Sequence, residues 1–135
     1  MTPGQRRILI ASDDLLGIQV LQYMHAHLGF ASKAPQNVDE AIQLLLTGSY
    51  DLAYIDFYHS PTAAIHLIQA IRNGDCGAAN RNLPIITISD YLRDFRHIEQ
   101  IQAGADALLG KPVYMEELKL LLSRYVGEQP DRKNR

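Results

Sequence analysis

Two patterns of apolar and polar positions alternate along this chain: short apolar runs, and longer segments with helical spacing. The short runs cover residues 8–11, 30–33, 52–55, 84–88 and 107–109. The first of them, Ile8-Leu9-Ile10-Ala11, contains no polar residue, which is typical of a strand buried on both faces of a sheet. We therefore predict a strand at each of these runs.

The longer segments carry apolar residues every three or four positions and predict helices. They cover residues 15–28, 37–48, 63–72, 92–103 and 115–126. Gly29 and Gly104 directly follow two of these segments, and Asn37 with Glu40 three residues later predicts an N-terminal cap. Residues 73–82 are rich in Gly and Asn and predict a loop. Five strand–helix units in succession predict an α/β fold, in which helices cover both faces of a parallel sheet.

The composition agrees with a single globular domain, because the chain has 135 residues, of which 47% are hydrophobic and 21% charged. We place the domain at residues 1–126 and predict that the charged residues 127–135 form a flexible tail or linker. A formal net charge of −2 and the absence of Trp give no basic or aromatic footprint for nucleic acid or anionic lipid. No apolar run approaches the ~18 residues of a membrane span, so we expect a cytoplasmic protein.

The cysteine and the histidines show no pattern that suggests a metal site. The single cysteine, Cys76, lies in the predicted loop and cannot form an intrachain disulfide. We expect it to have no function, although exposure there would make it open to oxidation. The five histidines have no metal-binding spacing, and we expect their side chains to be solvated or partly packed.

Polar residues follow four of the five predicted strands. They are Ser12, Asp13, Asp14, Asp56, Ser89, Asp90 and Lys111, the last of which is followed by Pro112. Parallel strands share one carboxyl edge, where such folds bind their ligands. Carboxylates, a hydroxyl and an ammonium group together are the parts needed for magnesium-assisted phosphoryl transfer. Each residue alone also fits a helix cap or a turn, so the prediction depends on the set.

The stretches that carry this set resemble those of the response regulator receiver domain, over residues 7 to about 126. They are residues 7–14, 50–56, 83–89 and 103–112. The last is the most specific, because the spacing from Gly104-Ala105 to Lys111-Pro112 matches the family. The resemblance implies a flavodoxin-like doubly wound (βα)5 sandwich with strand order 2-1-3-4-5. It also implies a regulatory domain, not an enzyme.

The resemblance further implies a role for each site residue. Asp56 would take a phosphoryl group from a phosphohistidine, Ser89 would move toward that group, and Lys111 would pair with it. The cofactor would be Mg²⁺, with ligands from the Asp13 and Asp56 carboxylates, the Tyr58 backbone carbonyl, and a water held by Ser12. The Lys111–Pro112 peptide would be cis.

Several positions depart from the family pattern. Ser12 replaces the first acid of the usual pair, so we expect weaker magnesium binding, with Asp14 restoring part of the charge. Asp90 stands where the family has a small residue, and Leu108 replaces an aromatic residue that reports phosphorylation. Tyr58 and Tyr91 flank the site, where they would slow hydrolysis of the phosphoryl group.

These departures leave two further hypotheses open. One is a degenerate pseudo-receiver that binds proteins without phosphorylation. The other is a flavodoxin-like enzyme or cofactor protein, which is less favoured because the sequence contains neither a GxxxxGK[ST] phosphate loop nor a GxGxxG fingerprint.

The expected partners follow from the same resemblance. A sensor histidine kinase or phosphotransfer protein would supply the phosphoryl group. The output would be a downstream protein target or self-dimerisation, through the face formed by residues 92–103 and 107–126. No effector domain follows within this chain, and we expect direct contact with neither nucleic acid nor a membrane.

Overall fold

The computed structural model describes residues 5–57, 59–89 and 95–127. The strands among these residues form one five-stranded parallel sheet. The strands are β1 (Arg7–Ser12), β2 (Ala31–Lys33), β3 (Leu52–Asp56), β4 (Ile85–Ser89) and β5 (Ala107–Gly110). Their order across the sheet is β2-β1-β3-β4-β5. The fold is therefore the flavodoxin-like doubly wound sandwich, as the resemblance implied.

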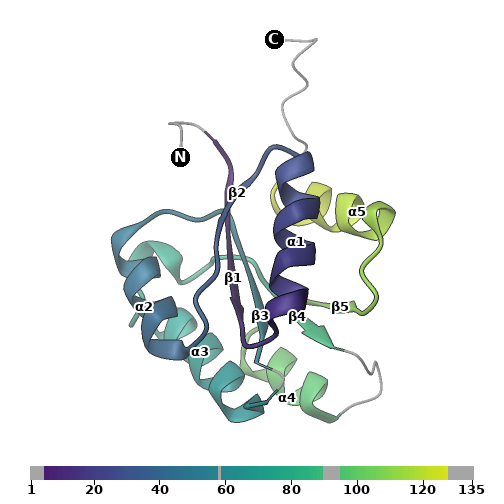
Figure 1. The fold of residues 1–135 in the computed structure, drawn as a ribbon. Helices are drawn as coiled ribbons and strands as arrows, with labels where there is room; N and C mark the ends of the chain where they lie inside the picture. Colours follow the sequence, from purple (N-terminus) through teal and green to yellow (C-terminus); the bar gives the residue numbers. More distant parts are fainter. Residues whose placement is uncertain (1–4, 58, 90–94, 128–135) are drawn as a thin grey trace.

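Helices cover both faces of the sheet (Figure 1). They are α1 (Leu15–His27), α2 (Val38–Thr47), α3 (Pro61–Asn73), α4 (Phe95–Ala103) and α5 (Met115–Tyr125). Successive residues of β1 serve opposite faces: Ile8 and Ile10 pack with α1 and α5, whereas Leu9 and Ala11 pack with α2 and α3. Strand β1 is therefore buried on both sides, which accounts for its apolar run Ile8–Ala11.

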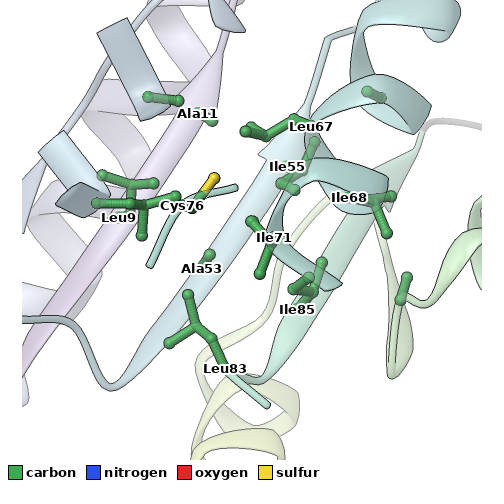
Figure 2. Close-up of a cluster of buried hydrophobic side chains, with 14 of the residues drawn as sticks. Leu9, Ala11, Ala53, Ile55, Leu67, Ile68, Ile71, Cys76, Leu83 and Ile85 are labelled. Atoms are coloured by element: carbon green, nitrogen blue, oxygen red, sulfur yellow. The ribbon is translucent and has the colours of Figure 1, made fainter. Parts of the chain in front are cut away.

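The core on the α2 and α3 side contains Cys76 (Figure 2). Its side chain is fully buried among residues that include Leu9, Ile71 and Leu83. The exposure that would have made Cys76 open to oxidation is therefore not found, and the expectation that Cys76 has no function stays a prediction. The chain turns back onto the sheet after Gly74, which ends α3 with a φ of 92°, and this turn brings the thiol into the core.

The core on the α1 and α5 side contains a fully buried histidine, His25. Its Nδ1 lies 2.8 Å from the Leu21 carbonyl oxygen, and its Nε2 lies 2.8 Å from the Tyr54 hydroxyl of β3. For His25, the expectation of a solvated or partly packed side chain is wrong. Burial lowers its pKa to about 4, which keeps the ring neutral inside the core.

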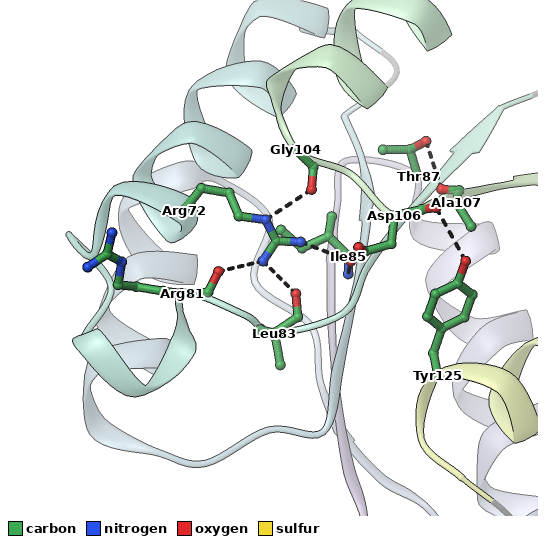
Figure 3. A network of polar contacts seen from close by, with 9 residues as sticks. All are labelled: Arg72, Arg81, Leu83, Ile85, Thr87, Gly104, Asp106, Ala107 and Tyr125. Atoms are coloured by element: carbon green, nitrogen blue, oxygen red, sulfur yellow. Dashed lines mark hydrogen bonds and ion pairs between the residues drawn. The ribbon is translucent and has the colours of Figure 1, made fainter.

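A polar network ties α3 to the sheet at the edge opposite the predicted site (Figure 3). The Arg72 guanidinium donates to the carbonyl oxygens of Gly104, Arg81 and Leu83, and pairs with Asp106 at 2.9 Å. Asp106 also accepts from the Ile85 N–H group at the start of β4. One side chain thus joins the end of α3 to the segments that enter β4 and β5.

The predicted element boundaries are close to the observed ones. Helix α3 begins at Pro61, two residues before its predicted start, because proline is well suited to the first helical turn. A 3-10 turn, Ala78–Asn80, lies inside the predicted loop. The predicted start of the fourth helix at Leu92 and the tail beyond Gly127 lie outside the described residues. None of the described helices is long and apolar enough to cross a membrane.

Candidate functional site

The carboxyl ends of the central strands meet at one edge of the sheet, as predicted. Ser12 and Asp56 are paired in register at the ends of β1 and β3. The Asp13 N–H group donates to the Asp56 carbonyl oxygen at 3.4 Å, and the Lys111 N–H group donates to the Ser89 carbonyl oxygen at 2.9 Å. Backbone contacts thus place all the predicted site residues that the structure describes around the same edge.

Asp56 and Lys111 form an ion pair at this edge. The Lys111 Nζ lies 2.9 Å from Asp56 Oδ2, and the Asp56 side chain is only 7% exposed. Burial raises the pKa of Asp56, as do the negative charges of Asp14 and Asp13, and together they outweigh the opposite effect of Lys111. Lys111 therefore partly compensates a carboxylate that is held in a poorly solvated position with two other acids nearby.

Lys111 also pairs with Asp14, whose Oδ2 lies 3.1 Å from the ammonium. Burial acts to lower the pKa of Lys111, but its two carboxylate partners raise it overall. The backbone amide of Gly17 and the Lys111 ammonium lower the pKa of Asp14. The Lys111 ammonium is therefore shared between two carboxyl groups, with the pKa of Asp14 lowered and that of Asp56 raised.

The two remaining residues of the Ser12-Asp13-Asp14 segment have different partners. The Ser12 side chain is 2% exposed, and its hydroxyl accepts from the Asp14 N–H group at 3.0 Å. The Asp13 carboxylate accepts from the His59 N–H group at 3.0 Å, in the loop that follows β3. Asp13 thus faces the β3–α3 connection, and Asp14 faces the β5–α5 connection.

A pocket of about 260 Å³ opens between α1 and the β5–α5 connection. The polar side chains of its wall are Ser12, Asp14, Asp56 and Lys111. Apolar residues form the rest, including Leu16 and Val20, which are largely exposed on α1. Asp56 is therefore accessible from solvent through a pocket whose charged groups lie at the carboxyl edge of the sheet.

The donor set around Asp56 fits a divalent cation that keeps part of its water shell. Asp13, Asp14 and Asp56 bring three carboxylates against one ammonium, and the charges of Asp13 and Asp14 act on Asp56. Within the described residues, no group of three or more His, Cys, Asp or Glu side chains is arranged as a complete metal site. Mg²⁺ commonly takes only one or two carboxylates from a protein, so two of these carboxylates would be enough to hold it.

Other predicted features have different outcomes. The Lys111–Pro112 peptide is cis, as the resemblance implied. Tyr58, with its predicted metal-binding carbonyl, and Asp90 and Tyr91 lie outside the described residues. Leu108, which stands where the family has an aromatic residue, lies in β5 in register with Thr87. This position is therefore part of the sheet.

The contact between Asp14 and Lys111 is the feature that sequence reasoning did not locate. We predicted only that Asp14 would restore some charge, and gave it no partner. One signal was present: Gly17 is a glycine within the first helix, where its lack of a side chain leaves room beside the Asp14 carboxylate. A Cβ atom at Gly17 would lie 2.6 Å from Asp14 Oδ2.

Comparison with known proteins agrees with this geometry. Residues 8–123 match the family described as the response regulator receiver domain. The transcriptional regulatory protein RprY of Bacteroides fragilis is 28% identical over 130 residues, which are 96% of this chain and 52% of that protein. The transcriptional regulatory protein DltR of Streptococcus agalactiae is 23% identical over 83% of this chain and 48% of its own length. The chain thus spans about half the length of these curated relatives.

Solved structures show the same fold. The receiver domain of the sensor histidine kinase PA1611 from Pseudomonas aeruginosa, which has a magnesium ion in its active-site cleft, superposes with a TM-score of 0.79 at 23% identity. That match covers 93% of this chain and 100% of the other. The receiver domain of the Francisella response regulator 1452 gives a TM-score of 0.74 at 26% identity, over 90% and 96% of the two chains. From the family match, the shared fold and the acids at the carboxyl edge, the chain belongs to the response regulator receiver domains of two-component signalling.

Proposed function

We propose that this domain takes a phosphoryl group onto Asp56, with Mg²⁺ as its cofactor, and that the modification changes its binding to a partner. The observation that carries the proposal is the buried Asp56 carboxylate at the end of β3, paired with Lys111 at 2.9 Å and open to a pocket. A carboxylate in this setting is both accessible to a phosphodonor and supplied with a cation for the phosphoryl oxygens.

The transfer step follows from the position of these groups. An Asp56 carboxylate oxygen attacks the phosphorus of a phosphohistidine, and a P–O bond forms as the P–N bond breaks. The electron pair of the P–N bond stays on the imidazole nitrogen, which takes up a proton. Lys111 keeps its proton throughout and moves its contact from the carboxylate to a phosphoryl oxygen. Asp13, Asp56 and the Tyr58 carbonyl would hold Mg²⁺, which supplies a positive charge that offsets the repulsion between carboxylates and phosphate.

Phosphorylation would also act on the surface. The aspartyl phosphate would carry roughly −1.5 to −2 charges in total, in place of the −1 of the carboxylate, and this charge would attract Lys111 and the Ser89 hydroxyl. The Lys111 N–H group is bonded to the Ser89 carbonyl oxygen, so movement of either residue acts on the ends of both β4 and β5. The face formed by α4, β5 and α5 is therefore the proposed output surface, toward a protein target or a second copy of the chain.

A sensor histidine kinase or a phosphotransfer protein is the proposed phosphodonor. The relatives in Bacteroides fragilis and Streptococcus agalactiae are named transcriptional regulatory proteins, and this chain spans about half of each. Our expectation of no direct contact with nucleic acid therefore concerns these 135 residues, not a longer regulator. It remains a prediction, as do the non-enzymatic role and the cytoplasmic location.

One observation favours the pseudo-receiver as a second candidate. The position of the first acid of the usual pair is taken by Ser12, whose hydroxyl accepts from the Asp14 N–H group. A domain that binds Mg²⁺ too weakly would keep the fold and lose the chemistry. The two hypotheses differ in one measurable property, which is phosphorylation of Asp56.

The direct test uses phosphoramidate, a small donor with a P–N bond, and Mg²⁺. Intact-protein mass spectrometry should show one added phosphoryl group on the wild type and none on Asp56→Asn. Asp75→Asn, which changes an exposed acid, is the matched control and should be modified like the wild type. An unmodified but folded wild-type protein, at a magnesium concentration that saturates other receivers, would favour the pseudo-receiver.

A further inference from the structure

The Lys111 ammonium lies between two carboxylates of different burial. Asp56 Oδ2 is 2.9 Å away and its side chain is 7% exposed, whereas Asp14 Oδ2 is 3.1 Å away and its side chain is 34% exposed. The two acids come from different strand ends, so their common contact fixes the ammonium at a defined place.

Three features of the chain hold Asp14 in that place. The Ser12 hydroxyl accepts from the Asp14 N–H group at 3.0 Å, which orients the backbone where β1 passes into α1. The Asp14 carbonyl oxygen accepts from the Ile18 N–H group at 2.9 Å and starts the helix. Gly17 leaves the space that the carboxylate occupies, since a Cβ atom there would approach Oδ2 to 2.6 Å.

Gly17 supports the placement of Asp14 independently of the two hydrogen bonds. A glycine within a helix destabilises it relative to alanine, because the unfolded chain has more conformational freedom to lose. The close approach of the Asp14 carboxylate supplies the reason for a glycine at this position. The segment Ser12–Gly17 is thus arranged as a unit around the carboxylate that contacts Lys111.

We infer that Asp14 is the positioning residue of Lys111. It takes the place, two positions later in the chain, of the acid that the family has at the position of Ser12. The replacement also moves the charge outward. An acid at position 12 would lie in a strand at a residue that is 2% exposed, whereas the Asp14 side chain is 34% exposed at the rim of the pocket. The charge that holds the ammonium is therefore kept where its desolvation cost is lower.

This inference rests on the proposed function for its consequence, which is the place of Lys111 when a phosphoryl group arrives. The inference about position can be tested without any phosphoryl group. The ammonium signals of a protein labelled with ¹⁵N-lysine report directly whether Lys111 is held. A positioned ammonium gives a distinct signal with slow proton exchange, and a free one does not.

The expected result is loss or a clear shift of the Lys111 ammonium signal in Asp14→Asn, with the backbone spectrum otherwise preserved. Gly17→Ala should produce a similar shift by crowding the carboxylate. The double variant Ser12→Asp with Asp14→Asn should recover the signal, and Asp75→Asn should leave it unchanged. A wild-type signal in Asp14→Asn, or no recovery in the double variant, would overturn the inference.

The second readout is the affinity for beryllofluoride, a phosphoryl mimic, in the presence of Mg²⁺. Asp14→Asn should weaken it roughly 2- to 5-fold, as expected for the loss of one partly exposed ion pair, and the double variant should restore most of that loss. Unchanged affinity in Asp14→Asn would contradict the consequence drawn for the site. Failure of the wild type to bind beryllofluoride would contradict the proposed function, while the ammonium signal would still decide the role of Asp14.

Discussion

The Lys111 Nζ lies 2.9 Å from Asp56 Oδ2, so the buried carboxylate at the end of β3 depends on a cation from the loop that follows β5. The pair is unequal in burial, with the lysine side chain 21% exposed and the aspartate 7%. Because burial raises the pKa of Asp56, the folded protein holds this anion at a cost in stability.

Asp56→Asn is therefore expected to stabilise the fold by about 1 kcal/mol near neutral pH. A raised pKa in the folded state means that Asp56 contributes stability at acid pH, which is lost as the pH rises through the folded pKa. The gain from the variant should thus shrink as the pH falls toward the ordinary value of 3.8. Urea unfolding at several pH values measures this, and a variant less stable than the wild type at neutral pH would contradict it.

His25 should make the domain sensitive to mild acid. Its pKa is lowered from 6.5 to about 4, so the unfolded chain binds a proton that the folded protein excludes between these values. The contribution of His25 to the free energy of unfolding is fully present above pH 6.5 and is lost progressively as the pH falls toward 4. We expect a loss of about 2 kcal/mol between about pH 7 and pH 5.

The matched variants for this prediction are His25→Gln and His66→Gln, the second on the exposed side of α3. Unfolding by urea at the two pH values should show a smaller pH dependence in His25→Gln alone. An equal pH dependence in the wild type and His25→Gln would assign the effect to other groups.

Arg72 should be among the most sensitive polar positions. Arg72→Met removes the donors to the carbonyl oxygens of Gly104 and Leu83 and the partner of Asp106. We expect a loss of about 2–3 kcal/mol in the free energy of unfolding. Arg124→Met, at an exposed position of α5, should change it by less than about 0.5 kcal/mol. Similar values for the two variants would show that the network in Figure 3 contributes little.

The Cys76 thiol should be protected in the native protein. Its side chain is fully buried, and burial raises its pKa, so little thiolate is available. A disulfide reagent should therefore label Cys76 slowly in buffer and rapidly in urea. Fast labelling of the folded protein would contradict the placement of Cys76 in the core.

The sequence predicted the elements well because strand burial and helix periodicity leave direct patterns. The apolar run at Ile8–Ile10 packs on both faces, and the convergence of Asp56 and Lys111 follows from the shared carboxyl edge of parallel strands. Contacts decided by tertiary geometry were less accessible. The burial of Cys76 depends on a turn after α3, and that of His25 on its bond to Tyr54 in β3.

The apolar spacing of the first helix predicted a wider buried face than the structure shows for α1. Leu15 and Tyr23 fit the helical spacing of the first helix, yet they are 62% and 66% exposed. The buried residues of α1 are Ile18, Leu21, Met24 and His25, so the packed face includes a polar residue that a count of apolar positions omits. The spacing predicted the helix correctly, and only the sheet decides which side of it is covered.

The most direct test of phosphoryl acceptance at Asp56 is a backbone amide NMR titration with Mg²⁺ and beryllofluoride. We predict saturable shifts around Asp13, Asp56, Ser89 and Lys111, absent in Asp56→Asn, with further shifts in α4, β5 and α5 if Leu108 transmits the change. A folded wild-type protein that shows no response at millimolar Mg²⁺ would contradict the phosphoacceptor function and leave a constitutive binding domain.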